Sequence, residues 1–381
     1  MLKIALLTDG IFPYVIGGMQ KHSYYLTKYL ARNKVHVTLY HFSQSKEHDI
    51  QQLHLFTLEE KQYIKSVVID FPKQDIFPGH YVRTSFLYSV KIFEHLKNNM
   101  NVDFIYAKGF TGWKLMDEKK NGFKCPPVGI KLHGMNMFSK PYSLKSRLEQ
   151  FLLQPPAKFN LENTDYVFSY GGKITDVIKN KANIPAEKII EIPTGIEESW
   201  INPDVKNSND VVRFIFIGRY ERLKGIEELM EVIKELNEKY NFQFDFIGHI
   251  PEHLRIKSSK INYWGILTKQ EQIKEILQQS DVLVCPSYSE GMPNVILEAM
   301  ASGMAVIATD VGAVNLMVSK ENGWLINSPE PKEILEAIIS AINLPKYNLL
   351  EMQQKSIAKI KEKYLWDKII AKTIDEITKR I

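Results

Sequence analysis

The sequence predicts an α/β protein built from two doubly wound, mainly parallel sheets. Short runs rich in apolar residues alternate with longer helical segments along the whole chain, the pattern of parallel strands with helices on both faces of a sheet. The chain has 381 residues, more than the roughly 250 to 300 that one hydrophobic core supports. A segment rich in proline, glycine and polar residues, 193–210, divides the expected strands into two sets.

The expected strands are numerous enough for a separate sheet on each side of this segment. Those before it are Lys3–Thr8, Val35–Phe42, Ser66–Phe71, Asp103–Ala107, Val128–His133, Tyr166–Ser169 and Ile189–Ile192. Those after it are Val211–Ile217, Phe242–Ile247, Ile261–Trp264, Val282–Cys285, Ala305–Ala308 and Gly323–Ile326. We therefore expect a Rossmann-like N-terminal domain, 1–195, and a Rossmann-like C-terminal domain, 196–363. An amphipathic helix, 364–381, carries isoleucines on one side and can pack on either domain, including back on the N-terminal one.

The charge is unevenly distributed between the two halves. The net charge is only +5, which argues against a nucleic-acid partner. Residues 1–190 carry 26 Lys and Arg against 16 Asp and Glu, whereas residues 191–381 carry 23 against 28. The basic half is expected to meet an anion, either a phosphorylated ligand or the anionic inner face of a membrane. A dispersed basic surface without a partner is the alternative.

Cysteine content and hydropathy indicate the compartment. Two cysteines in a chain of this length do not form a disulfide framework. The apolar run at the start is too short for a signal peptide, and no segment has the roughly 18 to 20 apolar residues of a membrane-spanning helix. We expect a cytoplasmic protein, or one bound peripherally to the inner face of the cell membrane.

The turn after the strand that ends at Ile217 is expected to bind a diphosphate. It reads G-R-Y-E-R-L-K-G over residues 218–225 and leads into a helix from Ile226 to about Tyr240. The guanidinium of Arg219 can bind two phosphate oxygens, and Lys224 adds a second cation. A solvated basic turn is the alternative, but it does not require glycines at both ends.

The segment 287–303 contains two acidic residues in an otherwise apolar context. Pro293 suits the first turn of a helix and Gly303 its C-terminal end, so Glu290 lies in the loop and Glu298 in the helix. Carboxylates on both sides of the N–H groups at a helix start can bind sugar hydroxyls and a phosphate together.

Two features of the first half also follow expected strands. The pair Gly17-Gly18 leads into a helix, and glycines there allow a backbone to approach a ligand, although such a pair is more often a plain turn. His133 follows the fifth expected strand and precedes a glycine. An imidazole at that position can exchange a hydrogen bond with a substrate hydroxyl, while a structural role is the equal alternative.

The chain resembles the retaining glycosyltransferases with the GT-B fold, most closely glycosyltransferase family 4. The resemblance covers nearly the whole length. Its most specific marks are E-G-M-P-N-V-I-L-E-A-M-A-S-G from Glu290, A-V-I-A-T-D-V-G from Ala305 and G-R-Y-E-R-L-K-G from Gly218. Gly17-Gly18 and His133-Gly134 are less specific, but they occur in the expected order.

The resemblance implies that the two domains face each other across a cleft, with the donor, a nucleotide sugar, on the second domain and the acceptor on the first. It assigns Arg219 and Lys224 to the diphosphate, Glu298 to the ribose and Glu290 to the donor sugar. The implied donor-binding residues are Gly17, Gly18, Gly218, Arg219, Lys224, Glu290, Gly291, Met292, Pro293, Asn294, Val295 and Glu298. The implied catalytic residues are His133, which would contact the transferred sugar, and Arg219, Lys224 and Glu290.

The resemblance further implies that the anomeric configuration is retained and that no cofactor is needed beyond the nucleotide sugar. The sequence has no D-x-D pair, so basic side chains are expected in place of a metal ion. The pair His249 and His253 has no third ligand and an intervening proline, which makes a zinc site a poor interpretation. Many relatives carry Gly-Gly and an acid after the strand at 305–308, whereas this chain has G-A-V-N-L from Gly312, which puts the sugar contacts of that loop in doubt.

Lysines next to aromatic residues favour a lipid-linked or polysaccharide acceptor near a membrane. They occur on one helix of the first half and after His133, at Lys21, His22, Tyr24, Tyr25, Lys28, Tyr29, Met137, Phe138, Lys140, Tyr142, Lys145 and Arg147. The alternative is that the helix aromatics belong to the core and the lysines form its wet face.

The leading hypothesis is a hexosyltransferase of surface polysaccharide, lipopolysaccharide or glycolipid assembly. A nucleotide-sugar epimerase or hydrolase of the same fold, and a catalytically silent carbohydrate-binding subunit, are the alternatives. The donor base cannot be read from the sequence, and a UDP-sugar is expected only because such donors are common.

Overall fold

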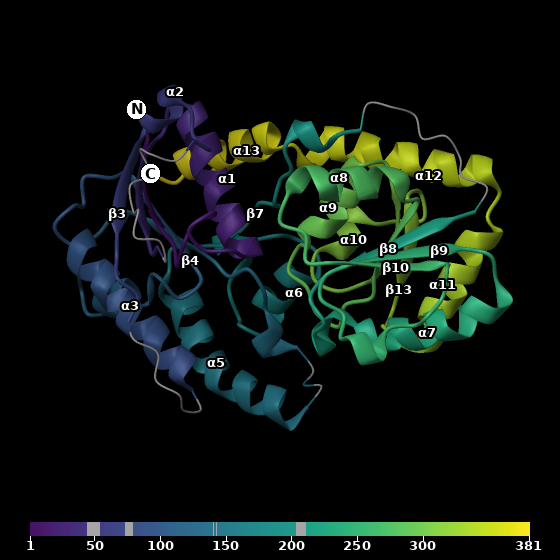
Figure 1. The fold of residues 1–381 in the computed structure, drawn as a ribbon. Helices are drawn as coiled ribbons and strands as arrows, with labels where there is room; N and C mark the ends of the chain where they lie inside the picture. Colours follow the sequence, from purple (N-terminus) through teal and green to yellow (C-terminus); the bar gives the residue numbers. More distant parts are fainter. Residues whose placement is uncertain (44–53, 73–78, 140, 142, 203–210) are drawn as a thin grey trace. The chain divides into compact units, whose positions relative to one another are not determined.

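The chain forms two compact units in the computed structural model, which describes residues 1–43, 54–72, 79–139, 141, 143–202 and 211–381 (Figure 1). Unit 1 comprises Met1–Pro193 and Trp366–Ile381, and unit 2 comprises Thr194–Leu365. The expected domain boundary after residue 195 lies two residues beyond the end of the first segment of unit 1.

Unit 1 contains a parallel sheet of seven strands within the described residues, in the order β3-β2-β1-β4-β5-β6-β7. The strands are β1 (Lys3–Leu7), β2 (His36–His41), β3 (Ile64–Val68), β4 (Phe104–Lys108), β5 (Val128–Lys131), β6 (Tyr166–Ser169) and β7 (Ile189–Glu191). Apolar cores lie on both faces of the sheet. Because both faces are covered, a central strand such as β4 buries every side chain.

The α-helices of unit 1 cover these two faces. They are α1 (Gly18–Arg32), α2 (Leu58–Lys61), α3 (His80–Leu96), α4 (Trp113–Lys120), α5 (Leu144–Asn163), α6 (Lys173–Asn180) and α13 (Trp366–Thr378). Three short 3-10 turns, η2 (Asn136–Phe138), η3 (Ala186–Lys188) and η4 (Glu198–Trp200), lie in connecting segments, the last of them in unit 2.

The C-terminal helix α13 belongs to unit 1 although it follows unit 2 in the chain. The indole of Trp366 stacks on the rings of Tyr25 and Tyr29 from α1, and Ile370 is fully buried in the same core. Of the isoleucines expected on one side of this helix, Ile369, Ile370 and Ile377 are buried, so its apolar face completes the core.

Unit 2 contains a parallel sheet of six strands within its described residues, in the order β10-β9-β8-β11-β12-β13. The strands are β8 (Arg213–Ile217), β9 (Gln243–Ile247), β10 (Ile261–Gly265), β11 (Val282–Cys285), β12 (Ala305–Thr309) and β13 (Gly323–Ile326). The helical segments are η5 (Arg222–Lys224), α7 (Ile226–Lys239), η6 (Glu252–Leu254), α8 (Gln270–Gln279), α9 (Asn294–Ala301), α10 (Val314–Met317), α11 (Pro331–Asn343), α12 (Lys346–Lys359) and the π-helical turn η7 (Ile360–Tyr364).

These sheets confirm the predicted α/β class with two doubly wound, Rossmann-like units. One strand lies elsewhere than expected, because β3 covers Ile64–Val68 and not Ser66–Phe71. β3 is an edge strand that pairs only with β2, so its pattern is weak, and Phe71 packs beyond its end on Phe42 and Tyr88. Over the described residues, no helix is both long and apolar enough to cross a membrane.

Candidate functional site

Two loops of unit 2 and the helix α9 place the expected donor-binding residues of this unit at one edge of its sheet, whereas Gly17 and Gly18 lie in unit 1. The first follows β8 and contains η5, and the second follows β11 and leads into α9. β8 and β11 are parallel neighbours, so their carboxyl ends lie side by side. Ligands of open α/β sheets bind outside the carboxyl ends of the strands, which makes this edge the candidate donor site.

Lys224 and Glu290 form an ion pair between these loops. Nζ of Lys224 lies 2.6 Å from Oε1 of Glu290, and the two side chains are 27% and 11% exposed. The hydroxyl of Ser287 donates to the same oxygen at 2.7 Å. Burial opposes the charged form of Lys224, but the carboxylate of Glu290 raises the pKa of the lysine above its ordinary value. The site therefore holds a full cation next to a carboxylate.

Two glycines allow the loops to come this close. Gly225 has a φ of 64°, and a Cβ there would overlap the carbonyl oxygen of Pro286 after β11. Gly312 has a φ of 60° and lies against the carbonyl oxygens of Glu290 and Gly291. Only glycine adopts this backbone without strain and without a clash, so both positions hold the site loops in place.

Arg219 and Arg222 differ in how they are held. The side chain of Arg219 is 81% exposed, and its Nη1 lies 3.0 Å from Oε1 of Glu221. Arg222 forms an ion pair with Glu228 and donates to the Tyr288 hydroxyl at 2.8 Å, with its guanidinium 4.6 Å from the centre of that ring. The sequence interpretation missed this second arginine, although it lies in the same motif as Arg219.

The start of α9 presents backbone N–H groups beside Glu290. The helix begins at Asn294, so Pro293 is its N-cap and not a residue of the first turn, because its ψ of 121° is extended. No acidic residue lies in the first turn, which leaves the positive end of the helix dipole available to an anion. Val295 and Glu298 are half-buried further along the helix.

The loop after β12 leads into α10, which carries Asn315 near the position where relatives have an acid. Its Oδ1 is buried and has no hydrogen-bond partner among the described residues. A buried amide oxygen without a partner is costly in a folded protein. Asn315 therefore presents an unused acceptor at the start of α10.

Unit 1 places His133 in a buried polar cluster beyond β5. Its Nδ1 lies 2.5 Å from the hydroxyl of Tyr170, and its Nε2 is buried without a hydrogen-bond partner among the described residues. Nζ of Lys131 donates to the carbonyl of Ile192 at 2.8 Å and lies 3.9 Å from the centre of the Tyr170 ring. The sequence interpretation missed Tyr170, which orients the histidine, and Lys131, which packs on the Tyr170 ring.

A second buried lysine joins this cluster to the start of α1. Nζ of Lys108 contacts the Met19 carbonyl at 2.8 Å, the Ser23 hydroxyl at 2.6 Å and Nδ1 of His22 at 3.2 Å. The rings of His22 and His133 are 5.0 Å apart. Lys108 and Lys131 are in register at the ends of neighbouring strands, so two lysines and two histidines share this edge of the sheet.

The protonation of these groups follows from burial and from mutual repulsion. Burial and the charges of Lys108 and Lys131 hold the pKa of His22 and of His133 well below the ordinary value. Burial also lowers the pKa of both lysines. The histidines are therefore neutral at physiological pH.

Gly17 and Gly18 lie at the start of α1. The N-cap residue Gly17 has no side chain to cap the helix, and the first turn has no acidic residue. The side-chain amide of Gln20 donates to Asp9 at 3.3 Å. This end of α1 leads directly to His22, so the glycine pair and His133 belong to the same edge of unit 1.

Five of the ten described residues that were expected to meet the acceptor are buried, at His22, Tyr24, Tyr29, Met137 and Phe138. Tyr24 and Tyr29 are 5% and 3% exposed, and Met137 and Phe138 are also buried, which favours the alternative of a core face on α1. Lys140 and Tyr142 lie outside the described residues. Lys145 and Arg147 remain exposed at the start of α5.

Within the part of the chain that the structure describes, no group of three or more histidine, cysteine or acidic side chains could hold a metal ion. The pair His249 and His253 therefore has no third such ligand beside it among the described residues.

Comparison with solved structures defines the class of the fold. A sucrose-phosphate synthase from Thermosynechococcus elongatus superposes with a TM-score of 0.79 at 17% identity, over 100% of this chain and 99% of that one. The Anabaena protein HepE, in complex with UDP and glucose, gives a TM-score of 0.70 at 15% identity over the full length of both chains. The chain has the GT-B fold.

Two family models identify the family. The model described as Glycosyltransferase Family 4 matches residues 16–200, and the model described as Glycosyl transferases group 1 matches residues 212–343. Together they account for most of the chain, which belongs to glycosyltransferase family 4.

Curated relatives agree with this assignment. A glycosyltransferase assigned to teichuronic acid biosynthesis, TuaC of Bacillus subtilis, is 28% identical over 56% of this chain, but the match spans only 54% of that protein. An N-acetylgalactosaminyltransferase of Campylobacter jejuni, named for a diphospho-undecaprenol acceptor, is 25% identical over 72% of this chain and 76% of its own length. An uncharacterized glycosyltransferase of Methanocaldococcus jannaschii is 23% identical over 97% of both chains.

Proposed function

We propose that this glycosyltransferase is a retaining, metal-independent hexosyltransferase. It would move a hexose from a nucleotide diphosphate sugar, with UDP as the expected nucleotide, to a glycan or a lipid-linked acceptor. The product would belong to a cell-surface polysaccharide, a lipopolysaccharide or a glycolipid. The names of the Bacillus and Campylobacter relatives support this class of product.

The observation that carries the proposal is the ion pair between Lys224 and Glu290 at the edge of the unit 2 sheet. A cation is needed where the diphosphate leaves, and a carboxylate can accept hydrogen bonds from sugar hydroxyls. A donor placed there would separate the two charges and give each its own partner. The start of α9 would add backbone N–H groups to the same phosphates.

The chemical step breaks the bond between the anomeric carbon and the diphosphate oxygen and forms a bond from the acceptor oxygen to that carbon. Negative charge develops on the leaving diphosphate, where Lys224 stabilises it. The acceptor proton passes to an oxygen of the departing diphosphate, which makes a separate protein base unnecessary. Arg219 would have to leave Glu221 to join Lys224 on the diphosphate.

His133 is proposed to contact the transferred sugar through Nε2. The Tyr170 hydroxyl lies at Nδ1, and burial raises the pKa of that hydroxyl, so it remains a protonated donor. When the hydroxyl donates to Nδ1, the neutral imidazole carries its proton on Nε2 and can donate to a sugar oxygen.

Release of the nucleoside diphosphate tests the proposal. A transferase releases it rapidly only when an acceptor is present. Equal release with and without acceptor would indicate a hydrolase, a changed sugar without release would indicate an epimerase, and no reaction with any donor would indicate a silent binding subunit. The anomeric configuration of the product, measured by NMR, tests retention.

A further inference from the structure

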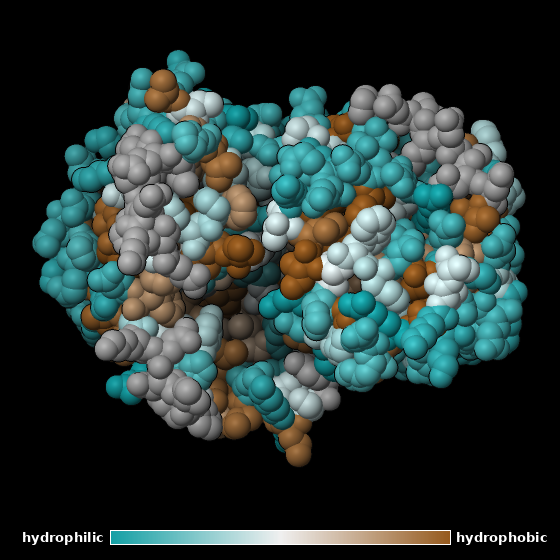
Figure 2. Space-filling model, viewed as in Figure 1, coloured by the Kyte–Doolittle hydropathy of each residue, from teal (hydrophilic) through white to brown (hydrophobic). Residues whose placement is uncertain are grey.

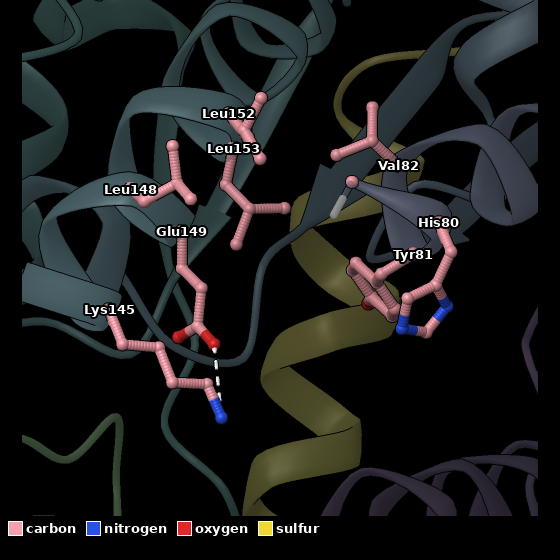
Figure 3. A pocket seen from close by; sticks show the side chains of 9 residues that line it. His80, Tyr81, Val82, Lys145, Leu148, Glu149, Leu152 and Leu153 are labelled. Atoms are coloured by element: carbon pink, nitrogen blue, oxygen red, sulfur yellow. Dashed lines mark ion pairs between the residues drawn. The ribbon is translucent and has the colours of Figure 1, made fainter. Parts of the chain in front are cut away.

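A cavity between α3 and α5 of unit 1 has no role in the site described above. Its volume is about 460 Å³, which falls within the range of roughly 300 to 1,000 Å³ of small-molecule sites. Figure 3 shows leucine side chains of α5 on one side and the first residues of α3 on the other. Leu148, Leu152 and Leu153 line it from α5, and Tyr81 and Val82 line it from α3.

The surface around this cavity is apolar and charged, with two cations and the carboxylate of Glu149, which lies 4.0 Å from Nζ of Lys145. The first turns of α5 expose Leu144, Leu148 and Phe151, whose exposed fractions are 85%, 51% and 73%. Lys145 and Arg147 are exposed in the same turns. In Figure 2 apolar atoms protrude where α5 begins, at the bottom of the view. Apolar side chains alternating with cations are typical of helices that meet anionic lipid.

A smaller cavity of mixed lining, with Met19, Phe71 and Phe110 among its apolar residues, shares one residue with the apolar cavity. Tyr81 lines both of them, and the second, of about 40 Å³, is also lined by Asp9, Ser85 and Lys108. Asp9 follows β1, and Lys108 is the last residue of β4. The smaller cavity therefore lies at the carboxyl ends of the strands, and its volume holds about one small group such as a hydroxyl.

We propose that the apolar cavity between α3 and α5 binds the hydrocarbon chain of a lipid-linked acceptor, whose polar end lies beyond Tyr81 toward Asp9 and Lys108. The order of the cavities, apolar at α5 and supplied with Asp9 and Lys108 at the strand ends, matches a ligand with one hydrocarbon end and one polar end. This inference rests on the proposed function, because it takes unit 1 to be the acceptor unit.

The charges around the cavity favour a lipid over a second copy of the chain. In a symmetric dimer through this face, the same patch of each copy would meet the other, which brings Lys145 and Arg147 close to their counterparts. Lys145 is paired with Glu149 within each copy, so the repulsion falls mainly on Arg147, which an anionic lipid would instead attract.

Binding of dodecyl phosphate, at concentrations where it is monomeric, tests the proposal by isothermal titration calorimetry. Butyl phosphate and inorganic phosphate carry the same head group without the long chain. We expect dodecyl phosphate to bind at least tenfold more tightly than butyl phosphate, because its longer chain buries more apolar surface. Equal affinity of the two alkyl phosphates would overturn the proposal.

Substitutions of residues that line the cavity show whether the dodecyl chain binds there. Val82→Trp fills the cavity, and Leu148→Gln places an amide in its wall at a position exposed enough to preserve the fold. Each should weaken dodecyl phosphate binding at least tenfold, whereas Leu58→Trp, on the exposed face of α2, should leave it unchanged. Unchanged binding by both cavity variants would refute the assignment of the chain to this cavity, as would equal weakening by Leu58→Trp.

Two further measurements separate this inference from the proposed function and from other occupants. Unit 2 is expected to bind a nucleoside diphosphate without any lipid. A protein that binds dodecyl phosphate but no nucleoside diphosphate would refute the donor assignment and leave the lipid proposal standing. Sedimentation velocity without lipid should show a monomer whose mass Leu148→Gln does not change. A dimer that Leu148→Gln dissociates would show that a second copy covers the cavity and would overturn the proposal.

Discussion

Replacing Lys224 by methionine removes the cation of the proposed diphosphate site and keeps an apolar side chain of similar length. Nζ of Lys224 lies 2.6 Å from Oε1 of Glu290, in a position that is 27% exposed. Removing one preorganised group that stabilises developing charge costs about 3 to 4 kcal/mol of transition-state stabilisation, so kcat should fall by about a hundredfold or more.

The same change also affects stability, because Glu290 is 11% exposed and loses its cation. The Ser287 hydroxyl still donates to the carboxylate. A buried polar group that loses its partner lowers the free energy of unfolding by roughly 1 to 3 kcal/mol, and we expect a loss near the lower end of this range. The double variant Lys224→Met with Glu290→Gln removes the unpaired charge. It should recover stability in urea denaturation without recovering kcat.

The assay is the release of nucleoside diphosphate from the donor in the presence of acceptor. Lys239→Met serves as a matched control, since Lys239 pairs with Glu235 on the exposed surface of α7. The control should retain wild-type kcat. A Lys224→Met enzyme whose kcat stays within threefold of wild type would refute the role of this lysine at the diphosphate.

The remaining predictions concern unit 1 and the absence of a metal requirement. Tyr170→Phe removes the hydroxyl that orients His133 and should lower kcat about tenfold with a smaller change in KM; steady-state kinetics equal to wild type would contradict the proposed role. The free energy of unfolding should decrease from pH 7 to pH 5, because the unfolded chain binds protons that His22 and His133, with lowered pKa values, do not bind in the folded state. Urea denaturation at several pH values measures this slope, and a His133→Gln variant with an undiminished slope would count against the contribution of His133. Activity should persist in excess chelator, and a strict requirement for magnesium or manganese would show the metal-independent mechanism to be wrong.

The fold could be predicted largely because buried parallel strands are short, apolar and regularly spaced. Strands such as β6 and β11 lie where the sequence predicted them, since both are covered on both faces. β3 was displaced because an edge strand pairs on one side only and has a weaker pattern. α5 contains Pro155 and Pro156 within its length, which local rules would take as a helix end.

The pairings within the candidate site could not be predicted from the sequence. Lys224 and Glu290 were assigned to separate parts of the donor, whereas the structure joins them, because two loops far apart in sequence meet at one sheet edge. The exposed position of Arg219 depends on a side-chain conformation that its motif does not determine. The buried contacts of Lys131 and Tyr170 depend on which strands are neighbours, which follows only from the three-dimensional fold.

Thermal unfolding of the purified protein with a panel of nucleoside diphosphates and nucleotide sugars tests whether unit 2 binds the donor. A ligand that binds only the folded state raises the Tm. We expect one nucleotide to raise the Tm of the wild-type protein clearly and to raise the Tm of Lys224→Met by less. No shift with any nucleotide, at concentrations up to the millimolar range, would contradict the assignment of unit 2 as the donor-binding unit.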